Sequence, residues 1–170
     1  MEDFRVLAER HHKAVFRLAY RMTGNQHDAE DVVQECFLRA FKQLSKFDGR
    51  SAFGTWLHRI AANCAIDLIR ARKKRDSQQG TEWNPEITAS DDPSPERLTR
   101  SVEIRRMLEP ALAQLSDMER AAFVMRHYEG LGIDEIGTTL GVQPNAAKHT
   151  VFRAVQKLRR ALQPAWRVSQ

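Results

Sequence analysis

Five side chains near the C-terminus have the types and the spacing to contact duplex DNA. They are Lys148, His149, Phe152, Arg153 and Lys157. Residues three and four apart share one side of a helix. An apolar stripe on another side of the same helix consists of Ala147, Val151, Ala154, Val155 and Leu158. Such a helix is typical of recognition in the major groove, although an amphipathic core helix with a solvated basic face, which Arg159 and Arg160 would extend, shows the same pattern.

The segment before this helix favours DNA recognition over an amphipathic core helix, because it has the form of a helix-turn-helix motif. We predict a short helix from Ile133, a sharp turn at Gly141, and a second helix that Pro144-Asn145 starts and that runs from Ala146 to about Leu162. Gly137 inside the first helix costs about 1 kcal/mol relative to Ala, so close packing has to offset it.

A second group of residues could bind unpaired bases and phosphates. It combines aromatic, amide and cationic side chains, namely Phe47, Phe53, Trp56, Arg59, Asn63, Arg70, Arg72, Lys73, Lys74 and Arg75. Aromatic rings interleaved with cations suit base stacking and phosphate contact. Phe53 and Trp56 could equally be core residues, and a large ring such as Trp56 can be packed on one edge and exposed on the other.

A third group is acidic and lies on the outer face of a predicted helix. Its members are Asp28, Glu30, Asp31 and Glu35, with Gln34 among them. A solvated surface is the usual fate of such residues. A metal-dependent nuclease that used Asp28, Asp31, Glu35 and a His is a weaker alternative, because no His stands at ligand spacing beside them.

Apolar periodicity predicts the helices that position these groups. Three helices are expected in residues 1–75: one from Phe4 that stops at Thr23-Gly24-Asn25, one capped by Asn25 and ended by Asp48-Gly49, and one that reaches the basic run at Arg75. Phe41 belongs to the apolar face of the second helix.

The rest of the chain is predicted to form a linker and a second helical domain. Residues 76–95 are rich in Ser, Asp, Pro, Gly and Gln and have no period, so we assign them to a linker. In residues 96–170, Pro110 should kink or restart the first helix, and a capping box at Ser116-Asp117-Met118-Glu119 begins a helix to about Tyr128, which Gly130 stops.

Composition excludes other classes of protein. The chain has 170 residues, a net charge of +5 and 42% hydrophobic residues, with no apolar run of the roughly 20 residues that a membrane span needs. Net charges of +6 for residues 1–75, −4 for 76–100 and +3 for 101–170 suggest two modules that face a polyanion. The N-terminus lacks the features of a signal peptide, which predicts a cytoplasmic protein with Cys36 and Cys64 as buried, reduced thiols.

Three runs of the chain carry a resemblance to a known family. They read DAEDVVQECFLRAF, FDGRSAFGTWLHRIAANCAIDLIR and LSDMERAAFVMRHYEGLGIDEIGTTLGV. With their flanks they cover most of the chain outside the linker, in the family's order. The chain closely resembles the bacterial extracytoplasmic-function (ECF) sigma factors, the smallest group of the RNA polymerase sigma family.

The resemblance implies an all-α protein of two helical domains, regions 2 and 4, that catalyses no reaction itself. It assigns to the clamp coiled coil of the largest polymerase subunit the residues Asp28, Asp31, Val32, Gln34, Glu35, Phe37 and Leu38. It assigns the second group above, from Phe47 to the basic run, to a base flipped out of the minus-10 element and to nearby phosphates. It assigns Lys148, His149, Phe152, Arg153 and Lys157 to the minus-35 element.

The resemblance also implies partners. We expect core RNA polymerase, through its clamp and flap regions, promoter DNA, and an anti-sigma factor that could hold the protein at the membrane. We expect no cofactor, no metal and no small-molecule substrate.

Two departures from the family affect the helix-turn-helix motif. Family members usually carry Gly-Thr-Val, a basic residue, Ser and Arg where this chain has Asn145-Ala146-Ala147-Lys148-His149-Thr150. His149 in place of Ser changes the size and the donor geometry of a base-reading side chain, so the usual minus-35 preference is not expected. Gly132 stands where a Ser or Thr commonly caps the first helix. The alternative hypothesis is a dimeric, stand-alone helix-turn-helix regulator. This hypothesis does not explain the acidic helix or the Trp56 region.

Overall fold

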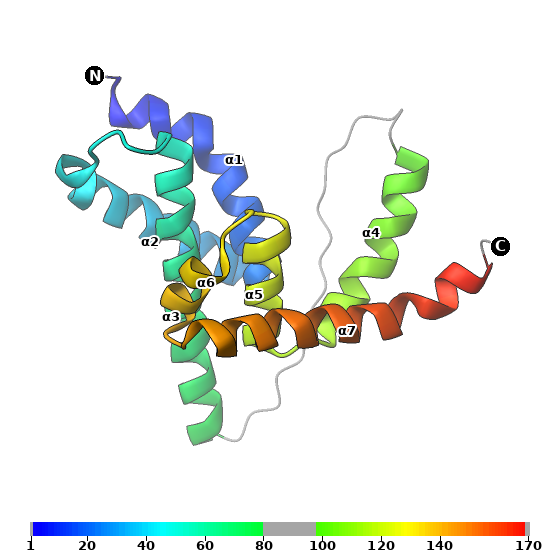
Figure 1. Cartoon of the computed structure of the whole chain (residues 1–170). Coiled ribbons are helices and arrows are strands. Elements are labelled where there is room, and N and C mark those ends of the chain that lie inside the picture. Colours follow the sequence, from blue (N-terminus) through cyan, green and yellow to red (C-terminus); the bar gives the residue numbers. More distant parts are fainter. Residues whose placement is uncertain (1, 80–97, 169–170) are drawn as a thin grey trace. The chain divides into compact units, whose positions relative to one another are not determined.

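The computed structural model describes residues 2–79 and 98–168, with side chains for 2–77 and 106–163. Every regular element in these ranges is helical, and the chain divides into two units, residues 1–86 and 87–170 (Figure 1). The all-α prediction with two helical groups is therefore confirmed. Most of the predicted linker, from residue 80 onward, lies outside the described residues.

The N-terminal unit is a bundle of three helices that pack against one another. They are α1 (Phe4–Thr23), α2 (Gln26–Gln43) and α3 (Phe53–Gln79), and a short 3-10 turn, η1 (Leu44–Lys46), follows α2. The core between them includes Leu18, Met22, Val32, Leu57 and Ile66, all nearly or completely buried. Burial of such side chains supplies most of the stability of a small helical unit.

The predicted helix boundaries between α1 and α2 are confirmed in detail. Gly24 ends α1 in the left-handed region with φ of 70°, and its N–H donates to the Tyr20 carbonyl. Asn25 then caps α2, because its side-chain oxygen accepts from the Asp28 N–H at 3.0 Å. A left-handed glycine followed at once by an N-cap residue reverses the chain within two residues.

Three details of this unit differ from the prediction. The second helix, predicted to be ended by Asp48-Gly49, already stops at Gln43, and the 3-10 turn η1 follows it. The helix α3 continues to Gln79, four residues beyond Arg75, and its last turns extend past α1 and α2 (Figure 1). Phe41, predicted on the apolar face of α2, is 63% exposed. Its ring packs only on Phe4 among the described aromatic rings, with centroids 5.3 Å apart, because α1 begins at this level and covers one side of it.

The C-terminal unit contains four helices built around the longest of them. They are α4 (Leu98–Ala113), α5 (Asp117–His127), α6 (Ile133–Leu140) and α7 (Pro144–Val168), and α7 packs on the other three. Leu112 and Leu115 join Ala154 and Leu158 of α7 in one core cluster. The helix α4 continues through Pro110 to Ala113 and does not restart there, although Pro110 cannot donate a backbone hydrogen bond to the preceding turn.

The predicted turns of this unit are confirmed. Ser116 caps α5 by accepting from the Glu119 N–H at 3.2 Å, and Gly130 adopts φ of 66° after the helix ends. Gly141 adopts φ of 69° between α6 and α7. A left-handed glycine at each of these points lets one helix stop and the next begin at a new angle.

Gly137 shows the close packing that its place in α6 requires. A Cβ atom added there would lie 3.0 Å from the Val142 carbonyl oxygen and 3.7 Å from the Ala147 Cβ. The Val142 N–H in turn donates to the Gly137 carbonyl at 2.9 Å. The absence of a side chain at Gly137 lets α7 approach α6, as in a helix-turn-helix motif.

None of the helices in the described ranges is both long enough and apolar enough to cross a membrane.

Candidate nucleic-acid interface

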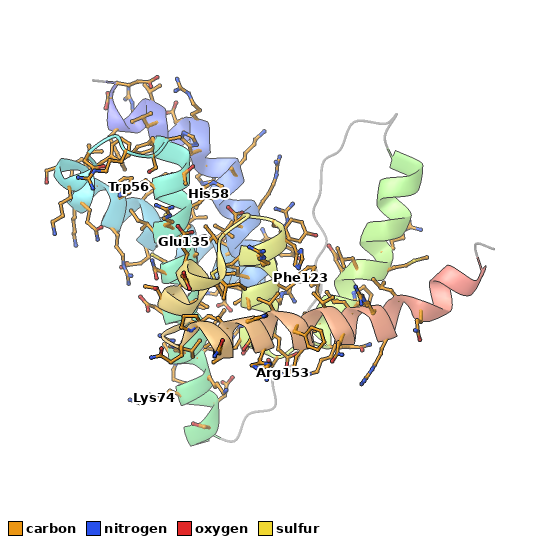
Figure 2. The ribbon with its side chains drawn as sticks, in the orientation of Figure 1. Trp56, His58, Lys74, Phe123, Glu135 and Arg153 are labelled. Carbon is orange, nitrogen blue, oxygen red and sulfur yellow. The ribbon has the colours of Figure 1, made fainter. Side chains whose placement is uncertain are left out.

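The first half of α7 presents an exposed basic and aromatic face. Lys148, His149, Phe152 and Arg153 are all exposed, whereas Ala147, Thr150 and Ala154 on the opposite side are buried. Phe152 is 57% exposed, which is unusual for a large apolar ring. Figure 2 shows Arg153 on the side of α7 that points away from α5. The face follows the turn at Gly141 directly, where a recognition helix would enter a groove.

Thr150 is buried beside this face and forms a hydrogen bond with one of its side chains. Its hydroxyl donates to the Ala146 carbonyl at 2.9 Å and accepts from Arg153 Nη2 at 3.3 Å. The second bond orients the Arg153 guanidinium along the helix while leaving the side chain exposed. This role could not be predicted from the periodicity, because Thr150 lies outside the apolar stripe.

Lys157 stands apart from the other four predicted residues. Its Nζ lies 2.9 Å from Oε1 of Glu119 on α5, and Glu119 is almost completely buried. The ammonium group is therefore directed toward α5, although the Lys157 side chain is still 46% exposed.

The predicted base-binding aromatic residues lie together at the start of α3. Ring centroids of Phe47 and Trp56 are 5.1 Å apart, those of Phe53 and Trp56 are 5.5 Å apart, and those of Phe47 and Phe53 are 5.6 Å apart. His11 of α1 lies 5.6 Å from Phe53. The three rings are each half-buried, so they pack on one another and still keep accessible edges.

Arg59 and Asn63 follow the aromatic cluster along the exposed side of α3. The Asn63 side-chain amide donates to the Arg59 carbonyl at 2.9 Å, and Asn63 is exposed. Trp56 lies toward one end of α3 and Lys74 toward the other (Figure 2). One helix thus carries both the aromatic cluster and the basic run.

The basic run is not uniformly available to a ligand. Arg70, Lys73 and Lys74 are exposed, but Arg72 is only partly exposed and forms an ion pair with Asp28 in the first turn of α2. Asp28 is itself 14% exposed. The structure thus joins one predicted DNA cation to one predicted polymerase contact.

The acidic face of α2 is partly neutralised by Arg39, which lies on the same helix. Arg39 donates to Glu35 at 2.7 Å and to Asp67 at 2.8 Å, and these two bonds raise its pKa. Asp31 and Gln34 are exposed, and Asp31 lies 3.8 Å from the imidazole of His27. Asp31 is the most accessible carboxylate among the predicted polymerase contacts.

The apolar residues among the predicted polymerase contacts of α2 differ in their exposure. Val32 is 1% exposed and belongs to the core, so it supports the acidic face from within. Leu38 is 52% exposed and Phe37 is half-buried, with the His12 ring stacked 6.2 Å from it. With Phe41, they form an apolar continuation of the acidic face that charge patterning alone did not reveal.

No group of three His, Cys, Asp or Glu side chains is arranged to hold a metal ion within the ranges that the structure describes. Asp28 and Glu35, two of the carboxylates in the nuclease alternative, instead face the guanidinium groups of Arg72 and Arg39.

Two family models match the chain. A model of sigma-70 region 2 matches residues 7–75, and a model of sigma-70 region 4 matches residues 105–158. The first match contains most of α1, all of α2 and the aromatic cluster, and the second contains the helix-turn-helix motif.

Curated relatives match over nearly the whole chain. The ECF RNA polymerase sigma factor SigE of Mycolicibacterium smegmatis is 37% identical over 159 residues, which cover 94% of this chain and 61% of the relative. The ECF RNA polymerase sigma factor SigW of Bacillus subtilis is 35% identical over 156 residues, which cover 87% of this chain and 82% of the relative. The chain thus spans less than two thirds of the first relative and most of the second.

A solved structure shares the fold. It is the co-crystal structure of the sigma factor RpoE with the anti-sigma factor NepR from Bartonella quintana. The match has a TM-score of 0.70 and 21% sequence identity, and it covers 96% of this chain and 98% of that chain.

Proposed function

The chain belongs to the ECF sigma factors of RNA polymerase, with sigma-70 regions 2 and 4, and on that premise we propose which of its surfaces bind polymerase and promoter DNA. Sigma factors are non-enzymatic subunits of the polymerase, so the chemistry of this chain is binding and strand separation. The observation that carries the proposal is the exposed face of α7 directly after the helix-turn-helix turn.

The minus-35 element is bound by the first half of α7. Lys148 and Arg153 supply donors for phosphates or guanine edges, His149 can donate or accept at a base edge, and Phe152 offers an apolar surface. The Gly141 turn and the close approach at Gly137 hold this face clear of α6.

The minus-10 element is bound along α3. The half-buried rings of Phe47, Phe53 and Trp56 form a surface against which a flipped base can stack, and the exposed Arg59 and Asn63 follow them on α3. Stacking on such a surface offsets the few kcal/mol that removal of a base from the duplex costs. Arg70, Lys73 and Lys74 neutralise phosphates farther along the helix.

The clamp coiled coil of the polymerase docks on α2. Asp31 and Gln34 provide the polar contacts, and the exposed Leu38 and half-buried Phe37 provide the apolar ones. Asp28 and Glu35 act at the edge of this face, since both are paired with arginines. The flap region of the polymerase is the partner that we assign to the C-terminal unit.

An anti-sigma factor is the third proposed partner. The RpoE protein that shares this fold was solved with the anti-sigma factor NepR. An inhibitor that covers the α2 face would keep the chain from the polymerase until a signal releases it. We place the protein in the cytoplasm, free or held at the membrane by such an inhibitor.

Two substitutions separate polymerase binding from promoter recognition. Asp31→Lys reverses the most exposed charge on the α2 face and should weaken binding to core polymerase by at least about tenfold. Arg153→Ala should leave core binding unchanged and weaken binding of the holoenzyme to a minus-35 element by roughly 1–3 kcal/mol. Glu9→Lys on α1 and Arg160→Ala on α7 are the matched controls, since both residues are exposed outside the proposed faces.

Fluorescence anisotropy with labelled core polymerase measures the first effect, and promoter-fragment binding by the assembled holoenzyme measures the second. Loss of core binding in Arg153→Ala, or unchanged core binding in Asp31→Lys, would overturn the assignment of the two faces. Specific duplex binding by the protein alone, with no core binding, would favour the stand-alone regulator.

A further inference from the structure

Lys157 lies on α7 one turn beyond Arg153, on the side of the helix that carries the proposed DNA contacts. Its ammonium group is nevertheless paired with a carboxylate of α5. Its Nζ lies 2.9 Å from Oε1 of Glu119, a residue 38 positions away in the sequence. Glu119 is 7% exposed, and its carboxylate belongs to the first turn of α5. A lysine with the spacing of a phosphate contact is thus paired with a buried carboxylate.

Both members of the pair are held in place by their own helices. The Glu119 backbone N–H donates to the capping oxygen of Ser116 at 3.2 Å, which anchors the start of α5. On α7, the buried residues Ala154 and Leu158 flank Lys157 and pack into the same core. The pair therefore crosses between α5 and α7 at the edge of the packed stripe, where a change in the rotation of α7 would separate the two groups.

Lys157 is the cation beside a carboxylate that is almost completely buried. The second oxygen of Glu119, Oε2, is buried and accepts no hydrogen bond from the described part of the chain. A carboxylate in such a place is stable only with a cation beside it, and removing that cation leaves a buried charge uncompensated. Movement of the Lys157 ammonium to a DNA phosphate would have this same effect, so DNA binding is not expected to recruit it.

We propose that Lys157 is a positioning residue, and that its pair with Glu119 sets the rotation of α7 on α5 that presents Lys148, His149, Phe152 and Arg153 to the minus-35 element. The inference rests on the proposed function and refines it, because it gives a role other than DNA contact to Lys157, which the family resemblance assigns to the minus-35 element. Lys148, which lies exposed at the start of the same helix, is the matched comparison.

The salt dependence of promoter binding distinguishes the two roles. A cation that contacts a phosphate contributes about 0.9 to the slope of log K against log salt concentration, whereas a positioning residue contributes nothing to that slope. The holoenzyme assembled with Lys157→Met, Lys148→Met or the unchanged chain is titrated with one promoter fragment at several salt concentrations. Amide hydrogen exchange of α5 and α7 in the free full-length chain reports the pair itself.

We expect Lys157→Met to weaken promoter binding about tenfold at every salt concentration, with an unchanged slope and faster exchange in α5 and α7. The double variant Glu119→Gln/Lys157→Met removes both charges and should recover to within about threefold of the unchanged chain. If Lys157→Met alone does not fold, the slope measured with the double variant still tests the proposal. A slope lowered by about 0.9 in either Lys157 variant would overturn the proposal.

Failure of the proposed function gives a different result. If the unchanged holoenzyme binds no promoter fragment, the function is wrong, while the exchange data still test the pair. If the double variant then exchanges no more slowly than Lys157→Met, the positioning role is wrong as well.

Discussion

Arg72 of α3 forms an ion pair with Asp28 in the first turn of α2, and both side chains are largely shielded from solvent. The pair joins the helix that carries the basic run to the helix proposed to dock on polymerase. A shielded carboxylate that loses its cation destabilises the folded state more strongly than an exposed one does.

Arg72 is therefore expected to act in stability, and its neighbour Lys73 in DNA binding. Arg72→Met should lower the free energy of opening α2 and α3 by about 1–3 kcal/mol, because the Asp28 carboxylate is left without its partner. Lys73→Met should change it by less than about 0.5 kcal/mol. Amide exchange across the two helices in the full chain measures both, and equal effects of the two variants would contradict the distinction.

Two glycines of the helix-turn-helix motif should respond to substitution in opposite directions. Gly132 caps α6 in an extended conformation without a side-chain hydrogen bond, and a Cβ there would meet nothing within 4 Å. Gly132→Ser should stabilise the motif by roughly 0.5–1 kcal/mol, through the new cap and the stiffer unfolded chain.

Gly137→Ala should destabilise the same motif by about 1 kcal/mol or more, since the methyl group would press on the Val142 carbonyl oxygen at 3.0 Å and force α7 away from α6. Thermal melting and exchange of α6 amides check the pair of variants. A stabilising Gly137→Ala would show that α6 and α7 are packed less closely than the structure indicates.

The stability of the N-terminal unit should fall as the pH drops below the ordinary His pKa of 6.5. Burial lowers the pKa of His11, and the nearby charges of His58 and Arg10 lower it further, while Glu2 opposes them. The unfolded chain then binds more protons than the folded one between the folded-state pKa and 6.5, so stability rises with pH across that window.

His11→Gln should reduce this dependence, because the glutamine side chain does not titrate in this range. Urea titrations at several pH values below and above 6.5, the ordinary His pKa, measure the difference. An identical pH dependence in the unchanged chain and in His11→Gln would show that His11 does not cause it.

Both cysteines should react slowly in the folded protein. Burial raises the pKa of the Cys36 thiol to about 12 and that of Cys64 to about 11. Cys36 also donates to the Leu57 carbonyl across a sulfur-to-oxygen distance of 3.7 Å. Alkylation by iodoacetamide should be at least about tenfold slower than in urea, because little thiolate is present. Equal rates would favour the redox alternative over buried structural thiols.

Much of the fold could be predicted because its boundaries are local. Asn25 and Ser116 bond to amides three residues away, and the left-handed turns at Gly24, Gly130 and Gly141 follow from glycine alone. Such signals need no knowledge of the rest of the chain. The exposed face of α7 was predictable for the same reason, since periodicity separates its buried and exposed sides.

The pairing of individual charges could not be predicted from local pattern. Arg72 and Lys157 have the spacing of DNA contacts, but each meets a carboxylate on a different helix. Which helices pack, and in what rotation, decides these pairs. The same holds for Phe41, whose exposure depends on where α1 begins beside it.

The most direct test of the central claim is transcription in vitro with purified core RNA polymerase and a pool of bacterial promoter fragments, with and without this protein. We predict initiation from a subset of fragments only when the protein is present, with those fragments sharing a minus-10 and a minus-35 element. Absence of protein-dependent initiation at any fragment, together with absence of binding to the core enzyme, would contradict the account.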